Sequence, residues 1–432
     1  MATVKEKATL KRSLKSRHMS MIAIGGTLGA GIFLTSGAAI AQSGPAGTLA
    51  AYIVMGLVVF TVMTSLAEMS TYMPVAGAFK TFPNRFVDPA LGFANGWSWW
   101  FGGAMTVAAE LVGSSIIMKY WFPNSSTAMW AMLFLAILVI LNLFSVKVFG
   151  ESSYWLSSIK VATVTVFIIV GILIITGAIG NEHIGFGNWI LYDPEKGQAP
   201  FVGGIGGVIS AFLIAGFSFS NIELIGISAA ESSNPSKDIK KSTYVVFFVI
   251  LFFYVGSLAI IGTIIPFTNE NLLNSGMNSV SQSPFTIIFS MTGLKMAASI
   301  INLVILTALL TCGNATLYSV ARLLCSMGES KDAPTFVAEI NDTGVPARAV
   351  IITAIFGGSA FFTSILGDGQ IYTICYSIVG ISAFLNWFTI SVSHYRFRKA
   401  YIKQGKDITE LKYTAPFYPY GVIFGMVICV IV

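Results

Sequence analysis

Apolar runs of about 20 residues recur along the whole of this 432-residue chain. A run of that length lets a helix cross a ~30 Å hydrocarbon core. Inside such a core each backbone N–H and C=O must be paired within the chain, so runs of this kind fold as helices. We therefore expect an all-α polytopic membrane protein. The eleven candidate spans are residues 19–40, 47–70, 91–122, 128–148, 152–178, 202–230, 243–266, 294–324, 349–366, 371–394 and a last run from 417.

The charge pattern predicts how the chain is oriented. Only 10% of the residues are charged against 55% hydrophobic, which leaves no room for a separate soluble domain. Most of the 25 Lys and Arg residues precede the first span or lie in loops after even-numbered spans. By the positive-inside rule we expect the N-terminus and these loops to be cytoplasmic. The net charge of +6 thus reports topology and contact with membrane lipid, and we expect no nucleic-acid partner.

Two spans are interrupted near their middles by glycines and small polar residues. The first reads Ile22-Ala-Ile-Gly-Gly-Thr-Leu-Gly-Ala-Gly-Ile-Phe33, and the second reads Gly216-Phe-Ser-Phe-Ser-Asn-Ile-Glu-Leu-Ile-Gly226. A matched pair of broken spans in two halves of a membrane chain points to a transporter's binding site. Spans one to five (19–178) begin inside and spans six to ten (202–394) begin outside. We therefore predict two inverted five-span repeats within a transporter domain of residues 19–432, preceded by a cytoplasmic tail of residues 1–18.

The first break contains the groups that an α-amino acid needs. Glycine tolerates nearly any backbone angle, so Gly29-Ala30-Gly31 can unwind and free the N–H groups of the outer half-helix. Those N–H groups suit a carboxylate. The freed carbonyls around Thr27 suit an ammonium. The alternative is close packing of helices through small residues.

The second break adds Phe217, Ser220 and Glu223 to this predicted substrate site. The aromatic ring can cover a bound substrate, and the Ser220 region offers further backbone oxygens. A carboxylate deep in a span is functional by default, so Glu223 is a candidate for substrate binding and for proton coupling. The alternative for Glu223 is a structural acid, protonated or paired with a lysine.

Two more charges lie deep within spans. Lys160 can carry a proton during a cycle or permanently fill the place of a sodium ion, and both interpretations argue against sodium coupling. A structural pairing of Lys160 with Glu223 or with a backbone carbonyl is the alternative. Glu110 lies on a small, polar face with Thr106 and Ser114, which favours pathway lining or a structural pairing equally. Glu68, near the inner end of its span, is interpreted as a salt-bridge partner.

The chain shows no pattern of catalytic residues, phosphate loop or metal-ligand spacing, so we expect neither an enzyme nor a cofactor. Its four cysteines are interpreted as inert small hydrophobes.

Several motifs give the chain a family resemblance. It resembles the amino acid permeases of the amino acid–polyamine–organocation superfamily, which share the LeuT-type fold. The matching stretches are Arg17-His-Met-Ser-Met-Ile-Ala-Ile-Gly-Gly-Thr27, Gly29-Ala-Gly-Ile-Phe33, Ser65-Leu-Ala-Glu-Met69, Tyr72-Met-Pro-Val75, Tyr154-Trp155 with Ile159-Lys160, Glu223-Leu-Ile-Gly226, and Ala229-Ala-Glu-Ser232 with Asn234-Pro235.

The resemblance implies uptake of an amino acid with protons across a bacterial plasma membrane, with Lys160 in place of the sodium of sodium-coupled relatives. It also implies twelve spans, so we expect the twelfth to be missing from this sequence. Within the family the likeness is strongest to lysine-specific permeases, from stretches such as Trp121-Phe-Pro123 and Ser283-Pro-Phe-Thr286. One departure is Ala30, where the family commonly has Thr or Ser, so backbone N–H groups must hold the carboxylate alone.

The resulting hypothesis is a proton-coupled symporter with lysine as the favoured substrate. Histidine, arginine or neutral amino acids remain open as substrates, and exchange remains open as the mode of transport. A membrane sensor that binds without transporting is less favoured because no large output domain is present. A channel is least favoured because no pore-loop filter appears.

Overall fold

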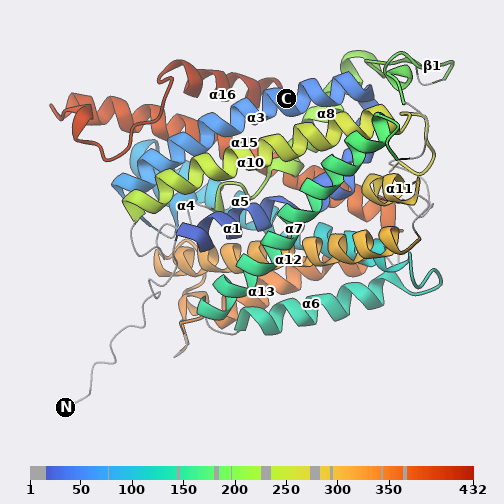
Figure 1. The fold of residues 1–432 in the computed structure, drawn as a ribbon. Helices are drawn as coiled ribbons and strands as arrows, with labels where there is room; N and C mark the ends of the chain where they lie inside the picture. The colour runs from blue at the N-terminus through green and yellow to red at the C-terminus, as the bar shows by residue number, and fades with distance from the viewer. Residues whose placement is uncertain are drawn as a thin grey trace.

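The computed structural model describes residues 16–432 except 76, 144–145, 180–183, 196, 225–234, 273–282, 292–294, 342–343 and 363–366. Long helices run side by side along one direction of the molecule (Figure 1). The described strands form one small antiparallel pair, β1 (Tyr192–Asp193) with β2 (Gly197–Gln198), in which Tyr192 faces Gln198. The expected all-α architecture is therefore confirmed.

The described helices have the following bounds, in chain order. They are α1 (Ser16–Thr27), α2 (Ala30–Phe33), α3 (Thr35–Tyr72), α4 (Ala78–Phe86), α5 (Pro89–Met118), α6 (Thr127–Leu143), α7 (Val146–Ile175), α8 (Gly204–Phe219), α10 (Pro235–Ile264), α11 (Pro284–Met291), α12 (Lys295–Glu329), α13 (Ala347–Gly357), α15 (Asp368–Lys403) and α16 (Tyr420–Ile431). The 3₁₀ helices are η1 (Gly187–Trp189), η3 (Thr335–Ala338), η4 (Gly358–Phe362) and η5 (Ile408–Glu410).

Six of these helices are long and apolar enough to cross a membrane by length and composition, counted over the described residues: α3, α5, α7, α10, α12 and α15. The other expected spans contain shorter apolar helices or the broken pair α1 and α2. Some expected bounds were wrong. Residues 146–148 belong to α7 rather than to the fourth span, because α6 ends at Leu143 and α7 begins at Val146. Further, α10 begins at Pro235, α15 continues to Lys403, and part of the sixth span lies outside the described residues.

The helix labelled α3 contains the boundary between the first and second spans. Gly44 within it has a φ of 73° and a ψ of 174°, which is not helical. Glycine reaches positive φ without a Cβ clash, and Pro45 is suited to the first turn of the helix that follows. The chain therefore turns at Gly44, as the separate predicted spans require.

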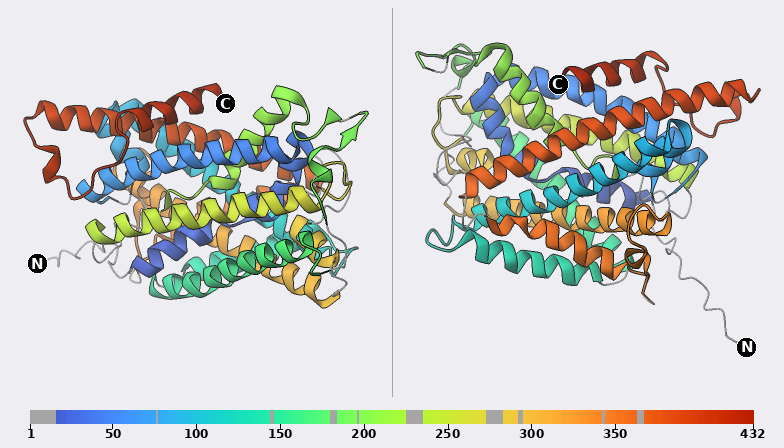
Figure 2. Two further views of the ribbon diagram at one scale, coloured as in Figure 1. Left: turned by 45° about the horizontal axis from the view of Figure 1, so that its top comes forward. Right: turned by 180° about the vertical axis from the view of Figure 1, so that it is seen from behind.

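Burial distinguishes a central helix from peripheral ones. In α5, 94% of the most apolar window is buried, whereas in α7 only 39% is. Apolar side chains of α7 such as Ile159, Ile169 and Ile172 are about half exposed, as expected for a helix that faces lipid. Helices α3, α8 and α10 pack together, and α15 crosses the far face beside α5 (Figure 2).

The two ends of the bundle carry different short helices. One end carries α4, and the opposite end carries α11 and the β1–β2 pair (Figure 1). We call them the α4 end and the α11 end. The sequence of residues 283–289 favours a short interfacial helix over an entrance, and α11 is helical from Pro284 onward. Several of its side chains, among them Phe285 and Ile288, are buried in the core, whereas Met291 is exposed.

Candidate functional site

The first break lies where it was predicted. Helix α1 ends at Thr27 and α2 begins at Ala30, so Leu28 and Gly29 are the non-helical residues between them. A Cβ built on Gly29 would collide with Glu110 Oε1 and lie 2.7 Å from Cys312 Sγ. A Cβ on Gly31 would lie 2.5 Å from the Cα of Ser218. These glycines are therefore required by close approach to α5, α12 and α8.

The carbonyls at the end of α1 meet donors from three other helices. Lys160 Nζ of α7 donates to the carbonyls of Gly25 (2.6 Å) and Leu28 (2.9 Å). Cys312 Sγ of α12 donates to Gly26 O at 2.7 Å. The backbone-carbonyl contact expected under the alternative for Lys160 is therefore present, while a role of Lys160 in proton coupling stays a prediction. Cys312 is more than the inert hydrophobe that we expected.

The N–H side of the break is occupied by Glu110. Both carboxylate oxygens of this α5 residue accept from the N–H of Ala30, each at 3.1 Å. Glu110 is 3% exposed, so this contact is shielded from water. A carboxylate of the protein thus occupies the backbone donor that was predicted to hold the carboxylate of an amino acid.

The second break begins later than the sequence indicated. Helix α8 continues through Phe219, so Phe217 lies in its last turn, with its ring 6.0 Å from that of Tyr376. Ser220 follows the helix and its hydroxyl donates to Phe217 O at 2.6 Å. Asn221 has a φ of 68°, a conformation that asparagine adopts more readily than most residues. The chain therefore leaves the helix at 220–223, and residues 225–226 of the predicted break lie outside the described part.

Glu223 lies in a separate polar cluster. Its Oε1 accepts from Trp99 Nε1 of α5 at 3.2 Å and from Asn386 Nδ2 of α15 at 3.1 Å. The side chain is 1% exposed. Glu223 therefore connects the second break to α5 and α15, and its hydrogen bonds are to neutral groups.

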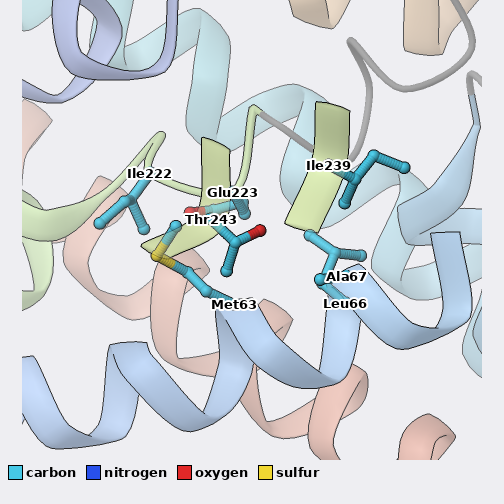
Figure 3. A pocket seen from close by; sticks show the side chains of 7 residues that line it. All are labelled: Met63, Leu66, Ala67, Ile222, Glu223, Ile239 and Thr243. Carbon is cyan, nitrogen blue, oxygen red and sulfur yellow. The ribbon is translucent and has the colours of Figure 1, made fainter. Parts of the chain in front are cut away.

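Two small cavities border Glu223. One, of about 10 Å³, lies between α3, the second break and α10, where Met63, Leu66 and Ala67 face Glu223 (Figure 3). The other, of about 20 Å³, is bounded by Ser220 and Glu223 and by Gly103 and Thr106 of α5. These volumes are close to what a single water molecule requires. Gly103 and Thr106 of the polar face of α5 therefore border a cavity, and lining of a transport pathway by this face stays a prediction.

Hydrogen bonds join the two breaks directly. Ser218 Oγ of α8 donates to Gly31 O at 3.2 Å and lies 2.7 Å from the hydroxyl of Tyr52. The Tyr254 hydroxyl of α10 lies 3.1 Å from Thr27 O and 2.6 Å from Ser218 O. These hydrogen bonds connect α1 and α2 with the last turn of α8, next to the second break.

The predicted residues fall into two groups. Thr27, Gly29, Ala30 and Gly31 come together with Glu110 and Lys160 around the first break, and Phe217 borders them through α8. Ser220 and Glu223 lie by the second break. Ser218, Tyr254 and Cys312 were not among the predicted site residues. A phenol in the middle of the apolar run of α10 was a usable signal for Tyr254, because a buried tyrosine hydroxyl usually finds a polar partner.

Glu68 is a salt-bridge partner, as expected, but a fully buried one. Arg398 of α15 donates to both of its oxygens, through Nε and, at 2.7 Å, through the second guanidinium nitrogen. His394 Nε2 lies 3.1 Å from Glu68 Oε2. This cluster lies between α3 and α15 and takes no part in the candidate site.

Comparison with known proteins gives three kinds of likeness. The family model described as "Amino acid permease" matches residues 18–432. The lysine-specific permease LysP of Escherichia coli (strain K12) is 44% identical over 424 residues, covering 98% of this chain and 86% of the relative. Histidine permease HisP of Lactococcus lactis subsp. cremoris (strain MG1363) is 43% identical, covering 96% of this chain and 86% of the relative. Lysine-specific permease LysP of the same strain is 42% identical, covering 98% of this chain and 83% of the relative.

A solved structure of a Na⁺-coupled sialic acid symporter in a substrate-bound outward-open state shares the fold. Its TM-score is 0.56 at 13% sequence identity, covering 97% of this chain and 88% of that one. The expected LeuT-type fold with broken first and sixth spans is therefore confirmed at the level of overall architecture. The inverted relation between residues 19–178 and 202–394 stays a prediction.

Proposed function

Because this chain belongs to the amino acid permease family, we propose that it is a proton-coupled symporter that imports L-lysine across the plasma membrane by alternating access. Membership of the family makes it a multi-pass membrane protein that transports amino acids. The substrate, the coupling ion and the orientation are the proposed parts.

One observation carries the proposed site: the first break already binds one group of each charge from the protein itself. The carboxylate of Glu110 accepts a hydrogen bond from the N–H of Ala30. The ammonium of Lys160 donates to the carbonyls of Gly25 and Leu28. Backbone groups that accept these two side chains are chemically suited to the carboxylate and ammonium of an α-amino acid. Substrate would displace Glu110 from Ala30 N–H and bind beneath Phe217.

The acids near the breaks support a cationic side chain. Glu110, once displaced, is a buried carboxylate within reach of the bound substrate, and an ω-ammonium is its natural partner. Glu223 is the second acid, and among the described residues its Oε2 has no hydrogen-bond partner. The names of two similar relatives specify lysine.

Coupling to protons is supported by the contacts of Lys160. Its ammonium occupies backbone carbonyls of a broken helix, which are the ligands that a sodium ion uses in such transporters. A fixed ammonium there competes with sodium, and Lys160 and Glu223 are the proposed proton-coupling groups. We propose no cofactor.

The decisive experiment is uptake of radiolabelled L-lysine into proteoliposomes, in competition with each of the twenty amino acids. We expect lysine to compete most strongly, a protonophore to abolish accumulation, and replacement of sodium by choline to change nothing. Accumulation that follows the sodium gradient and ignores pH would refute the coupling.

Histidine is the second candidate substrate, because the histidine permease is as similar as the lysine permeases. In the same competition assay, stronger inhibition by histidine than by lysine would identify it. Counterflow with and without a proton gradient separates symport from exchange.

A further inference from the structure

A single hydroxyl connects the two broken helices. Tyr254 of α10 is completely buried, and its oxygen lies within hydrogen-bond distance of Thr27 O, the last residue of α1, and of Ser218 O, in the last turn of α8. The Tyr254 ring packs 4.8 Å from Phe219 and 5.7 Å from Tyr52, centroid to centroid. The hydroxyl is therefore held in place by an aromatic cluster.

The two carbonyls are available because their helices end. In an uninterrupted helix each would accept from the N–H four residues later. The N–H of Ile222 instead donates to Phe219 O, which leaves Ser218 O to Tyr254. Thr27 O accepts from the N–H of Gly29, two residues later, and from Tyr254. Two carbonyls that converge on one donor are also a suitable receptor for a substrate ammonium.

A site of this kind presents a problem when it is empty. Carbonyls that are buried without a donor cost free energy comparable to a lost hydrogen bond, so an empty site resists closure around them. A neutral hydroxyl satisfies both without bringing a charge into the interior. It can leave when an ammonium, which donates more strongly, arrives.

We propose that Tyr254 is a positioning residue that stands in for the substrate ammonium in the empty carrier and so lets the empty carrier close and reorient. This inference rests on the proposed amino acid transport through the two breaks. It assigns Tyr254 to the return step, which net uptake needs and exchange of one substrate for another does not.

The test is the Tyr254→Phe variant in proteoliposomes, with radiolabelled L-lysine. Net uptake into empty vesicles and exchange against internal unlabelled lysine are measured in the same preparation. We expect exchange within about twofold of wild type and net uptake about tenfold lower, because the empty carrier loses the donor for Ser218 O.

The matched control is Tyr52→Phe. Tyr52 belongs to the same aromatic cluster, but its hydroxyl contacts the side chain of Ser218 rather than a backbone carbonyl. We expect the ratio of exchange to net uptake in this variant to match wild type. The same rise in the ratio in both variants would assign the effect to the cluster and overturn the inference.

Equilibrium binding of radiolabelled L-lysine to the purified protein separates the remaining outcomes. Tyr254→Phe should bind as tightly as wild type or up to about fivefold more tightly, since no hydroxyl has to be displaced. Weaker or absent binding, or an unchanged flux ratio, overturns the inference. If wild-type protein moves lysine in neither assay, the proposed function itself is wrong; if wild type moves it and only the ratio fails to change, the inference alone is wrong.

Discussion

At the scale of single residues, the site depends on side chains that satisfy an interrupted backbone. Lys160, Cys312 and Tyr254 donate to four of the carbonyls at the end of α1 and in the first break, and Glu110 accepts from the N–H across it. In hydrocarbon such a break persists only where its backbone groups are paired or line a cavity. Substitutions here should therefore alter binding and coupling more than they alter folding.

Gly29→Ala should weaken lysine binding at least about tenfold. The new Cβ would clash with Glu110 Oε1 and Cys312 Sγ. Shifting side chains and backbone to make room for an added carbon typically costs about 1–3 kcal/mol of free energy. The control is Gly206→Ala in α8, where a Cβ meets nothing within 4 Å. Equilibrium binding to both purified variants checks the prediction, and equal affinities would contradict it.

Lys160→Ala should lower steady-state accumulation of lysine about tenfold while leaving lysine–lysine exchange measurable. The variant removes the ammonium from Gly25 O and Leu28 O, and with it the proposed proton carrier. Thr165→Val, on the exposed face of the same helix, is the matched control. Accumulation equal to wild type would show that Lys160 takes no part in coupling.

At the scale of elements, buried polar pairs fix how the long helices meet. Asn142 of α6 donates to Asn314 of α12 at 2.7 Å, so this pair joins the two helices. The Glu68–Arg398 pair connects α3 with α15, and the N–H of Ala415 also donates to Glu68 at 2.6 Å. The segment before α16 is therefore tied to the same buried carboxylate.

Arg398→Met should destabilise the protein by about 3–5 kcal/mol, because it leaves the buried Glu68 with His394 as its remaining side-chain partner. Adding Glu68→Gln to this variant should recover part of the loss. Thermal melting of the purified proteins measures both changes, with the exposed Arg396→Met as the control. A double variant no more stable than Arg398→Met would show that the unpaired charge is not the cause.

At the scale of the whole molecule, side-chain contacts hold neighbouring segments together at each end of the bundle. At the α11 end the rings of Phe167 and Phe285 stack at 3.9 Å, and Ser283 Oγ donates to Phe33 O at 2.7 Å. At the α4 end Lys80 forms an ion pair with Asp332, which follows α12. The proposed alternating access requires the contacts at the two ends to open at different times.

The closure at the α4 end should weaken in acid. Partial burial opposes ionisation of Asp332, but hydrogen bonds from Lys80 and Ser330 outweigh it and hold the pKa of this carboxyl below its ordinary value. A depressed folded-state pKa contributes stability above the ordinary value, near 4, and that stability is lost as pH falls through the folded pKa.

Asp332→Asn should therefore lower stability by about 0.5–1 kcal/mol at neutral pH. The difference from wild type should shrink as the pH falls from about 4 through the depressed folded-state pKa of Asp332. Melting curves of the two proteins across this range measure it, and a difference independent of pH would exclude titration of Asp332 as its origin.

The membrane class, the positions of most spans and the first break could be predicted from the sequence. Hydrocarbon permits few backbone structures, so length and hydropathy decide much of the fold. Gly29, Ala30 and Gly31 could be predicted as binding residues and Lys160 as a separate coupling residue, because glycine breaks and deep charges are rare in spans. The second break was located less well, since Phe219 still continues the helix of α8.

Which groups meet across the breaks depends on how the helices pack in three dimensions. Lys160 donates to backbone carbonyls rather than pairing with Glu223, and Glu110 accepts from the N–H of Ala30. Tyr254 connects α1 to α8 through hydrogen bonds to Thr27 O and Ser218 O. Each contact joins residues more than 30 positions apart. The register and packing of neighbouring helices set such contacts, and no local pattern of hydropathy records them.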